Sequence, residues 1–454
     1  RGGPVAKARE SRYSLHSMNC SRVRAPTSGG RRRRPFPALL AGLFFAGLAS
    51  AIASDTEWTW ERCRAAALEE PAAPEVLAAR YAIAAAHARV AGAEAARRPR
   101  GELRAGVGWA DDAREEASGA AFGFALGVGG EMPLWPSRGM RAERDARAAE
   151  LAAARAAAER ADLHYEAALR EAFIELLAAQ EYAEWAKHWR ERRAQILDAI
   201  TARHLVGREQ VGQVDVARAA LAEMEAEVAL AAESVALRRA VLCARIGLAD
   251  APFERAVGFL GCDPPPAAPH DYDWEACIER APEMAEWDAA TARAAARARA
   301  AAARDDGQLD VVARAAPRTE RWTATEPDWF IGLRFTLPLF DGGRGRAEQA
   351  AAVQDALEIA ARREARRQAL NWELRIAWAE YRAAAERQTL LPERLAAAER
   401  RAAIARREFE IGLASSGPWE AAENDWAQKA RQALQIRRDA ALAQARWERL
   451  IYAA

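Results

Sequence analysis

Stretches in which apolar residues alternate with small or polar ones occur four times along the chain. They cover about 102–110, 121–129, 308–316 and 329–338. This period of two predicts β-strands with one apolar face, and roughly 9–11 residues is what a tilted membrane-spanning strand needs. A soluble hairpin packed on helices explains the strands alone equally well. Four strands cannot close a barrel, and lipid tolerates no open sheet edge, so the membrane interpretation requires an oligomer.

A long helical pattern follows each pair of predicted strands. The two patterns cover 141–204 and 346–409, and each predicts a helix of roughly 95 Å at about 1.5 Å per residue. Pro392 predicts a bend or a split in the second helix. With their return helices, the patterns form two long antiparallel hairpins, at 139–247 and 343–452. Helices of this length indicate staves that pack side by side in a cylinder or coiled coil.

The second half of the chain repeats the first. The tripeptide Pro-Leu-Trp at 133–135 corresponds to Pro-Leu-Phe at 338–340, and Gly207 corresponds to Gly412, with the same separation of 205 positions. One separation that holds through markers of different kinds indicates a duplication. The duplication predicts a first repeat at 54–260, a Pro-rich linker at 261–273 and a second repeat at 274–454.

The beginning of the chain has the three parts of an export signal. A basic cluster at 31–34 precedes a short apolar run at 36–48 and small residues at 49–53. This order predicts upstream read-through and a secretory signal peptide within 1–53. A basic tail followed by a buried helix is the alternative.

Composition and charge narrow the classes of function. Lys and Arg number 66 against 65 Asp and Glu, which leaves a formal net charge of +1. This balance provides no general attraction for nucleic acid, so we expect no nucleic-acid partner. Much of the hydrophobic content is alanine, which favours helices and buries little surface.

No motif for catalysis, cofactor binding or metal binding stands out in the sequence. Cys63 and Cys277 occupy corresponding places in the two repeats. They are either a disulfide pair or two small buried residues inherited by the duplication. The sequence therefore predicts a protein that is not an enzyme and that holds no cofactor and no metal.

The junctions between strand and helix carry the most specific motif. It reads FTLPLFDGG at 335–343, with a looser copy, EMPLW, at 131–135. These motifs resemble the strand-to-helix entry of the TolC family of outer-membrane efflux proteins, and the resemblance covers about 55–454. Within that family the chain looks most similar to the heavy-metal (CzcC-type) branch. The entry residues are Pro133, Pro338, Gly342 and Gly343.

The resemblance implies a mainly α-helical fold with a membrane β-barrel part. Three identical chains would share a twelve-stranded barrel in the outer membrane, in contact with its lipid, and their helices would form a tunnel in the periplasm. The chain would be the passive exit duct of a tripartite efflux system. A periplasmic adaptor (membrane fusion) protein and an inner-membrane pump of the RND type would deliver the substrate.

The resemblance also implies roles for the ends of the hairpins. The tips that would close the duct and contact the adaptor are marked by Gly207, Gly212, Gly412 and Gly417. A ring of like charges in a trimer favours cations, and the candidates for such a constriction are Glu209, Asp215, Glu420 and Glu423. Each of these acids is alternatively an ordinary solvated residue. The chain departs from the family at Pro418 and Ala421, where members often carry acids.

A periplasmic adaptor or helical scaffold without a channel is the competing function. An adaptor usually carries one hairpin with soluble β-domains around it. Two hairpins with short apolar strand pairs favour the channel. The class of substrate, whether metal ions, drugs or secreted protein, stays open.

Overall fold

The structure is a computed structural model of the chain. It describes residues 57–69, 73–110, 121–134, 138–248, 253, 255–265, 273–304, 306–320 and 323–452. The chain divides into two units, Arg1–Ser54 and Asp55–Ala454, and every described residue belongs to the second unit. The predicted signal peptide at 1–53 therefore lies outside the described residues.

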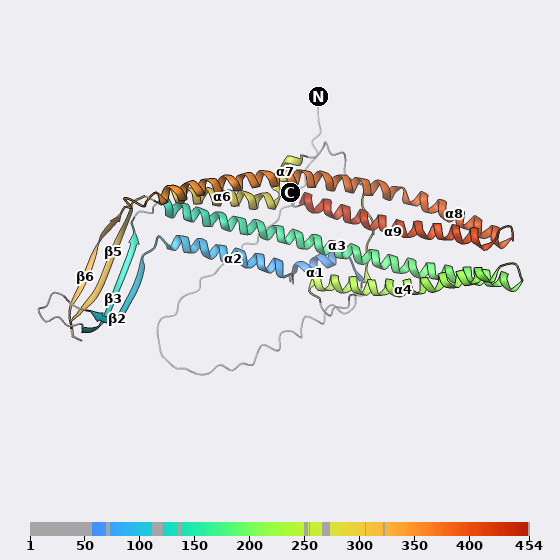
Figure 1. The fold of residues 1–454 in the computed structure, drawn as a ribbon, viewed down its shortest axis with the longest axis horizontal. Helices are drawn as coiled ribbons and strands as arrows, with labels where there is room; N and C mark the ends of the chain where they lie inside the picture. The colour runs from blue at the N-terminus through green and yellow to red at the C-terminus, as the bar shows by residue number, and fades with distance from the viewer. Residues whose placement is uncertain are drawn as a thin grey trace, which may run out of the picture. The chain divides into compact units, whose positions relative to one another are not determined.

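Helices make up most of the second unit (Figure 1). In chain order they are α1 (Trp60–Glu69), α2 (Pro74–Ala95), α3 (Arg138–Leu205), α4 (Val211–Ile246), α5 (Trp274–Arg280), α6 (Pro282–Ala302), α7 (Arg344–Thr389), α8 (Leu391–Glu410) and α9 (Ser416–Tyr452). Alanine is the best helix former, and the Ala-rich α3 alone runs for 68 residues. Proline begins α2 and α6, where its missing N–H costs no helical hydrogen bond.

The second long helix is divided at the place where the sequence predicted a bend or a split. α7 ends at Thr389 and α8 begins at Leu391, one residue before Pro392. Proline lacks the N–H that a continuous helix needs here, and its ring crowds the preceding turn. The corresponding position in α3 is Lys187, and α3 stays unbroken through it.

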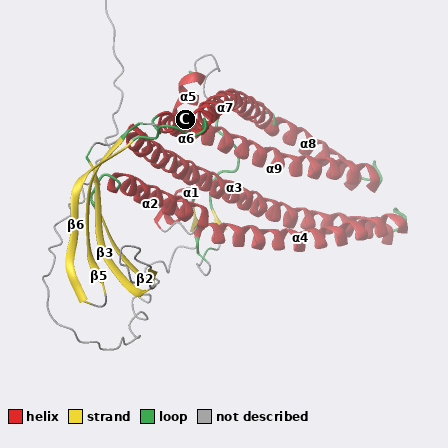
Figure 2. Cartoon of the chain, turned by 60° about the vertical axis from the view of Figure 1, so that its left-hand side comes forward, coloured by secondary structure: helices red, strands yellow, loops and turns green. Residues whose placement is uncertain are grey.

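Four strands form one antiparallel sheet in the order β2-β3-β5-β6. The central pairing joins the two repeats, because Val128 of β3 lies opposite Ala315 of β5 and Pro133 lies opposite Asp310. The sheet is a curved layer at one end of the helices (Figure 2). The strands are β2 (Arg100–Ala110), β3 (Ala121–Pro133), β5 (Gln308–Glu320) and β6 (Thr323–Thr336).

The second strand pair is longer than the alternation suggested. β5 continues to Glu320 instead of about 316, and β6 begins at Thr323 instead of about 329. The added pairs include Pro317 opposite Pro327, where the apolar and polar alternation is lost although the backbone remains extended. Among the described residues β2 and β6 each pair on one side only, so both ends of the sheet are open edges.

A second, smaller sheet ties the loop between the repeats to the helices. β1 (Glu57–Trp58) and β4 (Arg255–Ala256) pair in parallel. The chain then continues into the core, where Leu260 and Cys262 are buried. The first residues of the predicted linker at 261–273 are therefore packed on the helices, and the backbone N–H of Cys262 donates to Oε1 of Gln388 at 2.9 Å.

Two apolar cores of the same design hold the helices together. In the first, Leu169 of α3 and Leu242 of α4 are buried beside α1. In the second, Leu374 of α7 and Trp447 of α9 are buried beside α5. Each residue of the second pair lies 205 positions after its counterpart in the first. The two repeats therefore bury corresponding positions, although the side chains that fill them differ.

Candidate functional site at the hairpin tips and open edges

Each helical hairpin ends in a turn that requires glycine. Gly207 follows α3 with a φ of 74°, and Gly412 follows α8 with a φ of 84°. Glycine adopts this left-handed conformation without the steric cost that other residues meet, so both glycines end their helices. Gly212 and Gly417 differ from them, because they lie in the first turns of α4 and α9 with nothing within 4 Å of an added Cβ.

Both turns expose large apolar side chains. Solvent-exposed patches of this kind commonly mark sites of protein interaction. The exposed residues at and beside the two turns are Leu205, Val206, Val211, Ile411 and Leu413.

Charged and aromatic contacts fasten the two hairpins to each other near these turns. The Arg192 guanidinium of α3 donates two hydrogen bonds to the Glu423 carboxylate of α9, at 2.6 and 2.9 Å. The Trp419 indole also donates to Glu423, at 3.1 Å. Closer to the tip, Arg203 donates to the carbonyl of Ala414 at 3.1 Å and lies over the Phe409 ring. We call this set of contacts the tip clamp.

The four candidate acids differ in their exposure to solvent. Glu423 is 1 % exposed and Glu420 is 8 % exposed, both inside the packed hairpins. Glu209 is half-buried, whereas Asp215 is exposed and pairs with Arg218 at 2.9 Å. In the single chain, burial directs the carboxylates of Glu420 and Glu423 into the hairpin contact, and the acid ring of an assembled duct stays a prediction.

Glu420 lies in an electrostatically unfavourable position. Burial raises the pKa of its carboxyl group, nearby Glu209 raises it further, and Arg193 opposes the shift. Glu420 Oε1 and Glu209 Oε2 are both buried without a hydrogen-bond partner among the described residues. The junction of the hairpins therefore contains a carboxyl group that is easier to protonate than an ordinary glutamate.

No sequence pattern indicated the arginines that complete the tip clamp. Arg192 and Arg203 lie among many other arginines of α3, with no motif to separate them. Only the spacing of Trp419 and Glu423, one helical turn apart, indicates that both share a face of α9.

The predicted strand-to-helix entries lie where the sheet meets the long helices. Pro133 ends β3, and Pro338 follows β6. Gly342 and Gly343 take positive φ angles of 71° and 87° immediately before α7. The Asp341 carboxylate accepts hydrogen bonds from the backbone N–H groups of Gly343 and Gly345, which lower its pKa. The motif thus turns the chain from strand to helix and caps the helix with a carboxylate.

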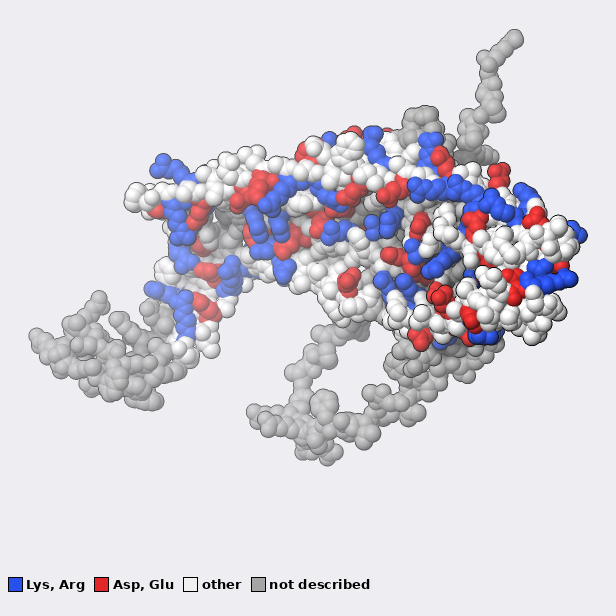
Figure 3. Space-filling view, turned by 45° about the vertical axis from the view of Figure 1, so that its right-hand side comes forward, with Lys and Arg blue, Asp and Glu red and all other residues white. Residues whose placement is uncertain are grey.

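The same turn exposes two large apolar side chains. Leu339 is 90 % exposed and Phe340 is 92 % exposed. Large apolar side chains at every second position of β6 are also exposed, and they are Trp329, Ile331, Leu333 and Phe335. Between the tips and the sheet, charges of both signs are interspersed along the helices (Figure 3). The sheet therefore carries the exposed apolar face that the alternation predicted.

Exposed apolar residues also line both edges of the row of helices. α4 packs on α3, α3 on α9, and α9 on α8, so α4 and α8 end the row (Figure 1). On one edge the exposed residues of α4 are Val216, Leu230, Leu237 and Val241. On the other edge the exposed residues of α7 and α8 are Val353, Leu357, Trp372, Ile376 and Ile404.

The cysteines do not pair across the repeats. Cys63 lies in the first core and Cys277 beside the second, and both are free thiols. Burial raises the pKa of Cys63 to about 12, so this thiol is unreactive. Among the described residues, no three His, Cys, Asp or Glu side chains group as metal ligands. Within the same residues, no helix is both long and apolar enough to cross a membrane.

Comparison with known proteins gives this architecture a family. The family model described as outer membrane efflux protein matches residues 67–248 and 275–451. The chain belongs to the outer membrane efflux protein family, the TolC family. The two matched segments correspond to the two repeats, and the members of this family are outer-membrane channels. No curated protein matches the chain.

Solved channels of this family share the fold at low sequence identity. VceC from Vibrio cholerae is 19 % identical with a TM-score of 0.74, over 86 % of this chain and 95 % of VceC. CusC is 14 % identical with a TM-score of 0.77, over 93 % and 98 %. CmeC from Campylobacter jejuni is 16 % identical with a TM-score of 0.73, over 87 % and 85 %. These likenesses confirm the predicted fold of helical hairpins joined to a small antiparallel sheet.

Proposed function

We propose that the chain is one third of an outer-membrane exit duct for efflux. Three copies close a twelve-stranded barrel, and their helices form one tunnel. A periplasmic adaptor and an inner-membrane pump deliver the substrate, and the duct itself conducts passively. Family membership supports the efflux channel, and the open edges of the single chain support the finer assembly.

The open sheet edges carry the proposal. β2 and β6 have unpaired backbone groups on one side, and the sheet presents an exposed apolar face. In lipid, each unpaired backbone group costs several kcal/mol, so the sheet requires closure. β2 of one copy and β6 of the next are complementary edges, and head-to-tail pairing of this kind generates a closed ring.

The edges of the helical row support the same association. The apolar residues of α4 on one edge and of α7 and α8 on the other are exposed in a single chain. Contact between these edges in neighbouring copies would bury them. The same rotation from one copy to the next would thus pair the open strand edges and bury the apolar residues at the helix edges.

The clamp at the tips supports a duct that is closed at rest. Arg192, Glu423 and Trp419 hold the second hairpin against the first within one chain. We propose that the adaptor contacts the apolar turns around Gly207 and Gly412, and that opening separates the hairpins at the clamp. Gly212 and Gly417 begin the return helices beside this contact.

Single-channel recording in a planar lipid bilayer tests the duct. The full chain, extracted in neutral detergent, is expected to form rarely opening pores. Glu423→Gln removes the charge that Arg192 pairs with. We expect it to raise the open probability roughly tenfold, the equivalent of about 1.4 kcal/mol of charge-assisted hydrogen bonding.

Glu399→Gln is the matched control, because Glu399 lies exposed on α8. It should leave the open probability unchanged. A preparation that inserts but never conducts, in the original chain and in both variants, would contradict the duct. Equal effects of both variants would contradict the role of the tip clamp in closure, but would not contradict the duct.

A further inference from the structure

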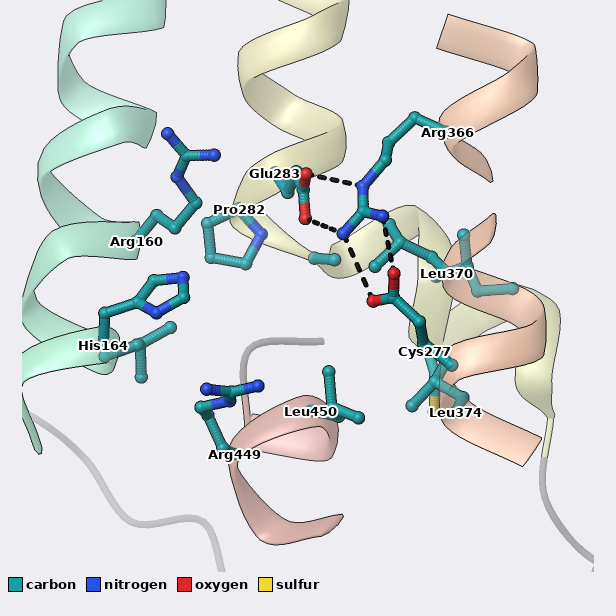
Figure 4. A pocket seen from close by; sticks show the side chains of 14 residues that line it. Arg160, His164, Cys277, Pro282, Glu283, Arg366, Leu370, Leu374, Arg449 and Leu450 are labelled. Atoms are coloured by element: carbon teal, nitrogen blue, oxygen red, sulfur yellow. Dashed lines mark hydrogen bonds and ion pairs between the residues drawn. The ribbon is translucent and has the colours of Figure 1, made fainter. Parts of the chain in front are cut away.

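A cavity opens where the helices of the second repeat meet end to end (Figure 4). α6 begins at Pro282, α9 ends just beyond Leu450, and both lie between α3 and α7. The cavity has a volume of about 100 Å³ and is partly open to solvent. The clamp and the strands contribute no residue to it.

The floor of the cavity is apolar. Side chains from five elements line it, and none of them belongs to the first repeat's core. Hydrocarbon therefore fits this part of the wall. The large apolar lining residues are Leu163, Ile278, Pro282, Leu370, Leu374 and Leu450.

The rim of the cavity is basic. Arg160 and His164 of α3 and Arg449 of α9 surround one side of the opening (Figure 4). Arg160 forms an ion pair with Glu286 at 3.2 Å. Within the described part of the chain, no ion pair or hydrogen bond occupies Arg449 or His164. Desolvation, then Arg449 and Arg160, lower the pKa of His164, whereas Glu283 and Glu75 oppose the shift.

Both carboxylates of the cavity are paired with the same arginine. The Arg366 guanidinium donates to Glu283 at 2.6 and 2.9 Å and to Glu373 at 2.7 and 3.2 Å. Arg366 lowers the pKa of Glu283. One arginine thus holds both acids on the α7 side and leaves the basic rim on the α3 and α9 side without an acidic partner at Arg449.

The corresponding junction in the first repeat is filled. Tyr165 occupies the position equivalent to Leu370, and its hydroxyl donates to the carbonyl of Arg245 at 2.6 Å. Trp58 and Phe253 pack against each other there, with ring centroids 5.4 Å apart, in the core that contains Leu169. Aromatic side chains therefore pack at this junction in the first repeat, whereas arginines line a cavity at it in the second.

We propose that the cavity binds a single-chain anionic amphiphile, with the anionic head at Arg449 and Arg160 and the hydrocarbon chain against Leu370, Leu374 and Leu450. Charge complementarity selects the head, and the apolar floor selects the chain. The cavity lies within one chain, so the inference does not depend on the proposed duct.

Cys277 provides a local readout, because it lines the cavity. The full chain in neutral detergent is alkylated with N-ethylmaleimide, and mass spectrometry follows each cysteine. Dodecanoate should slow alkylation of Cys277 roughly tenfold at saturation, as an occupied pocket excludes the reagent. Cys243, the other half-buried thiol, lies outside the cavity and should react at an unchanged rate. Dodecanol, with the same chain and no charge, should protect far more weakly.

Arg449→Gln should raise the half-protecting concentration of dodecanoate roughly tenfold, since charge-assisted hydrogen bonds to the carboxylate are lost. Arg160→Gln provides a second variant if the first does not fold. Arg401→Gln, on the exposed surface of α8, should leave this concentration unchanged.

Three results with the single-chain probes would overturn the proposal. They are no protection of Cys277, equal protection of Cys277 and Cys243, and equal protection by dodecanol and dodecanoate. Protection by dihexanoyl phosphatidylglycerol without protection by dodecanoate would assign the cavity to a two-chain lipid and overturn the single-chain ligand.

Discussion

At the scale of single residues, buried carboxylates determine how the hairpins meet. Glu423 has a full set of donors from Arg192 and Trp419. Glu420 lies three residues before Glu423 in α9. One of its carboxylate oxygens has no hydrogen-bond partner among the described residues, and Glu209 lies nearby. A buried charge without close pairing costs stability, so these two glutamates act in opposite directions on the same contact.

The pH dependence of stability distinguishes Glu420. Its folded pKa is raised, so its cost is absent below the ordinary pKa and appears as pH rises through the folded value. Glu420→Gln should therefore stabilise the protein by roughly 1 kcal/mol at pH 7 and have no effect near pH 4. Thermal unfolding of the detergent-solubilised protein at both pH values measures the difference. Destabilisation at pH 7 would show that Arg193 pairs with Glu420 more strongly than its geometry indicates.

The sequence indicated which part of the chain matters here, but not the environment of its residues. Glu420 and Glu423 were identified as candidates for the constriction because they follow the tip of the second hairpin. Burial depends on which helix packs against α9, and α3 is more than two hundred residues away in the chain. The sequence pattern of one helix does not contain that information, so the ion pair between Arg192 and Glu423 could not be predicted from it.

At the scale of elements, glycine fixes the places where helices reverse. Gly207→Ala should destabilise the protein by roughly 1–2 kcal/mol, because alanine is strained at a φ of 74°. Gly212→Ala is the matched control: it lies in the first turn of α4 with open space around it. This second change should be neutral or stabilising by up to about 1 kcal/mol. Thermal unfolding of both variants checks the prediction, and equal effects would contradict it.

The elements themselves were the most predictable part of the fold. Long runs of helical and alternating patterns predicted the long hairpins and the four strands of the main sheet. Pro392 predicted the interruption between α7 and α8. The strands β1 and β4 have two residues each, which is too short for any period to appear.

At the scale of the whole molecule, the proposed duct depends on contact between opposite edges of identical chains. Leu357 of α7 is 59 % exposed on one edge. Leu357→Glu would place a charge in the proposed contact between copies, which should cost a few kcal/mol per contact and shift the protein toward monomers. Gln428→Glu adds the same charge at an exposed position of α9, which is not at an edge of the row, and controls for net charge. Size-exclusion chromatography in neutral detergent compares the two variants, and equal elution of both with the original chain would exclude this edge.

The assembly was inferred from the strand edges that remain unpaired in a single chain. The alternation of residues predicted strands with one apolar face, and lipid physics then required more than four of them. Neither the sequence nor one chain specifies which partner the tips contact. The arginines of the cavity also carry no motif, because their grouping arises from α3 and α9 meeting at one place.

The mass of the protein in its detergent complex tests the central claim most directly. The chain is extracted from the outer-membrane fraction in neutral detergent, and light scattering with absorbance separates the protein mass from the detergent mass. A protein mass three times that of the single chain, obtained only with detergent, is the result expected for a shared barrel. A monomer in the soluble fraction would contradict the account, because four strands with two open edges cannot span a membrane alone.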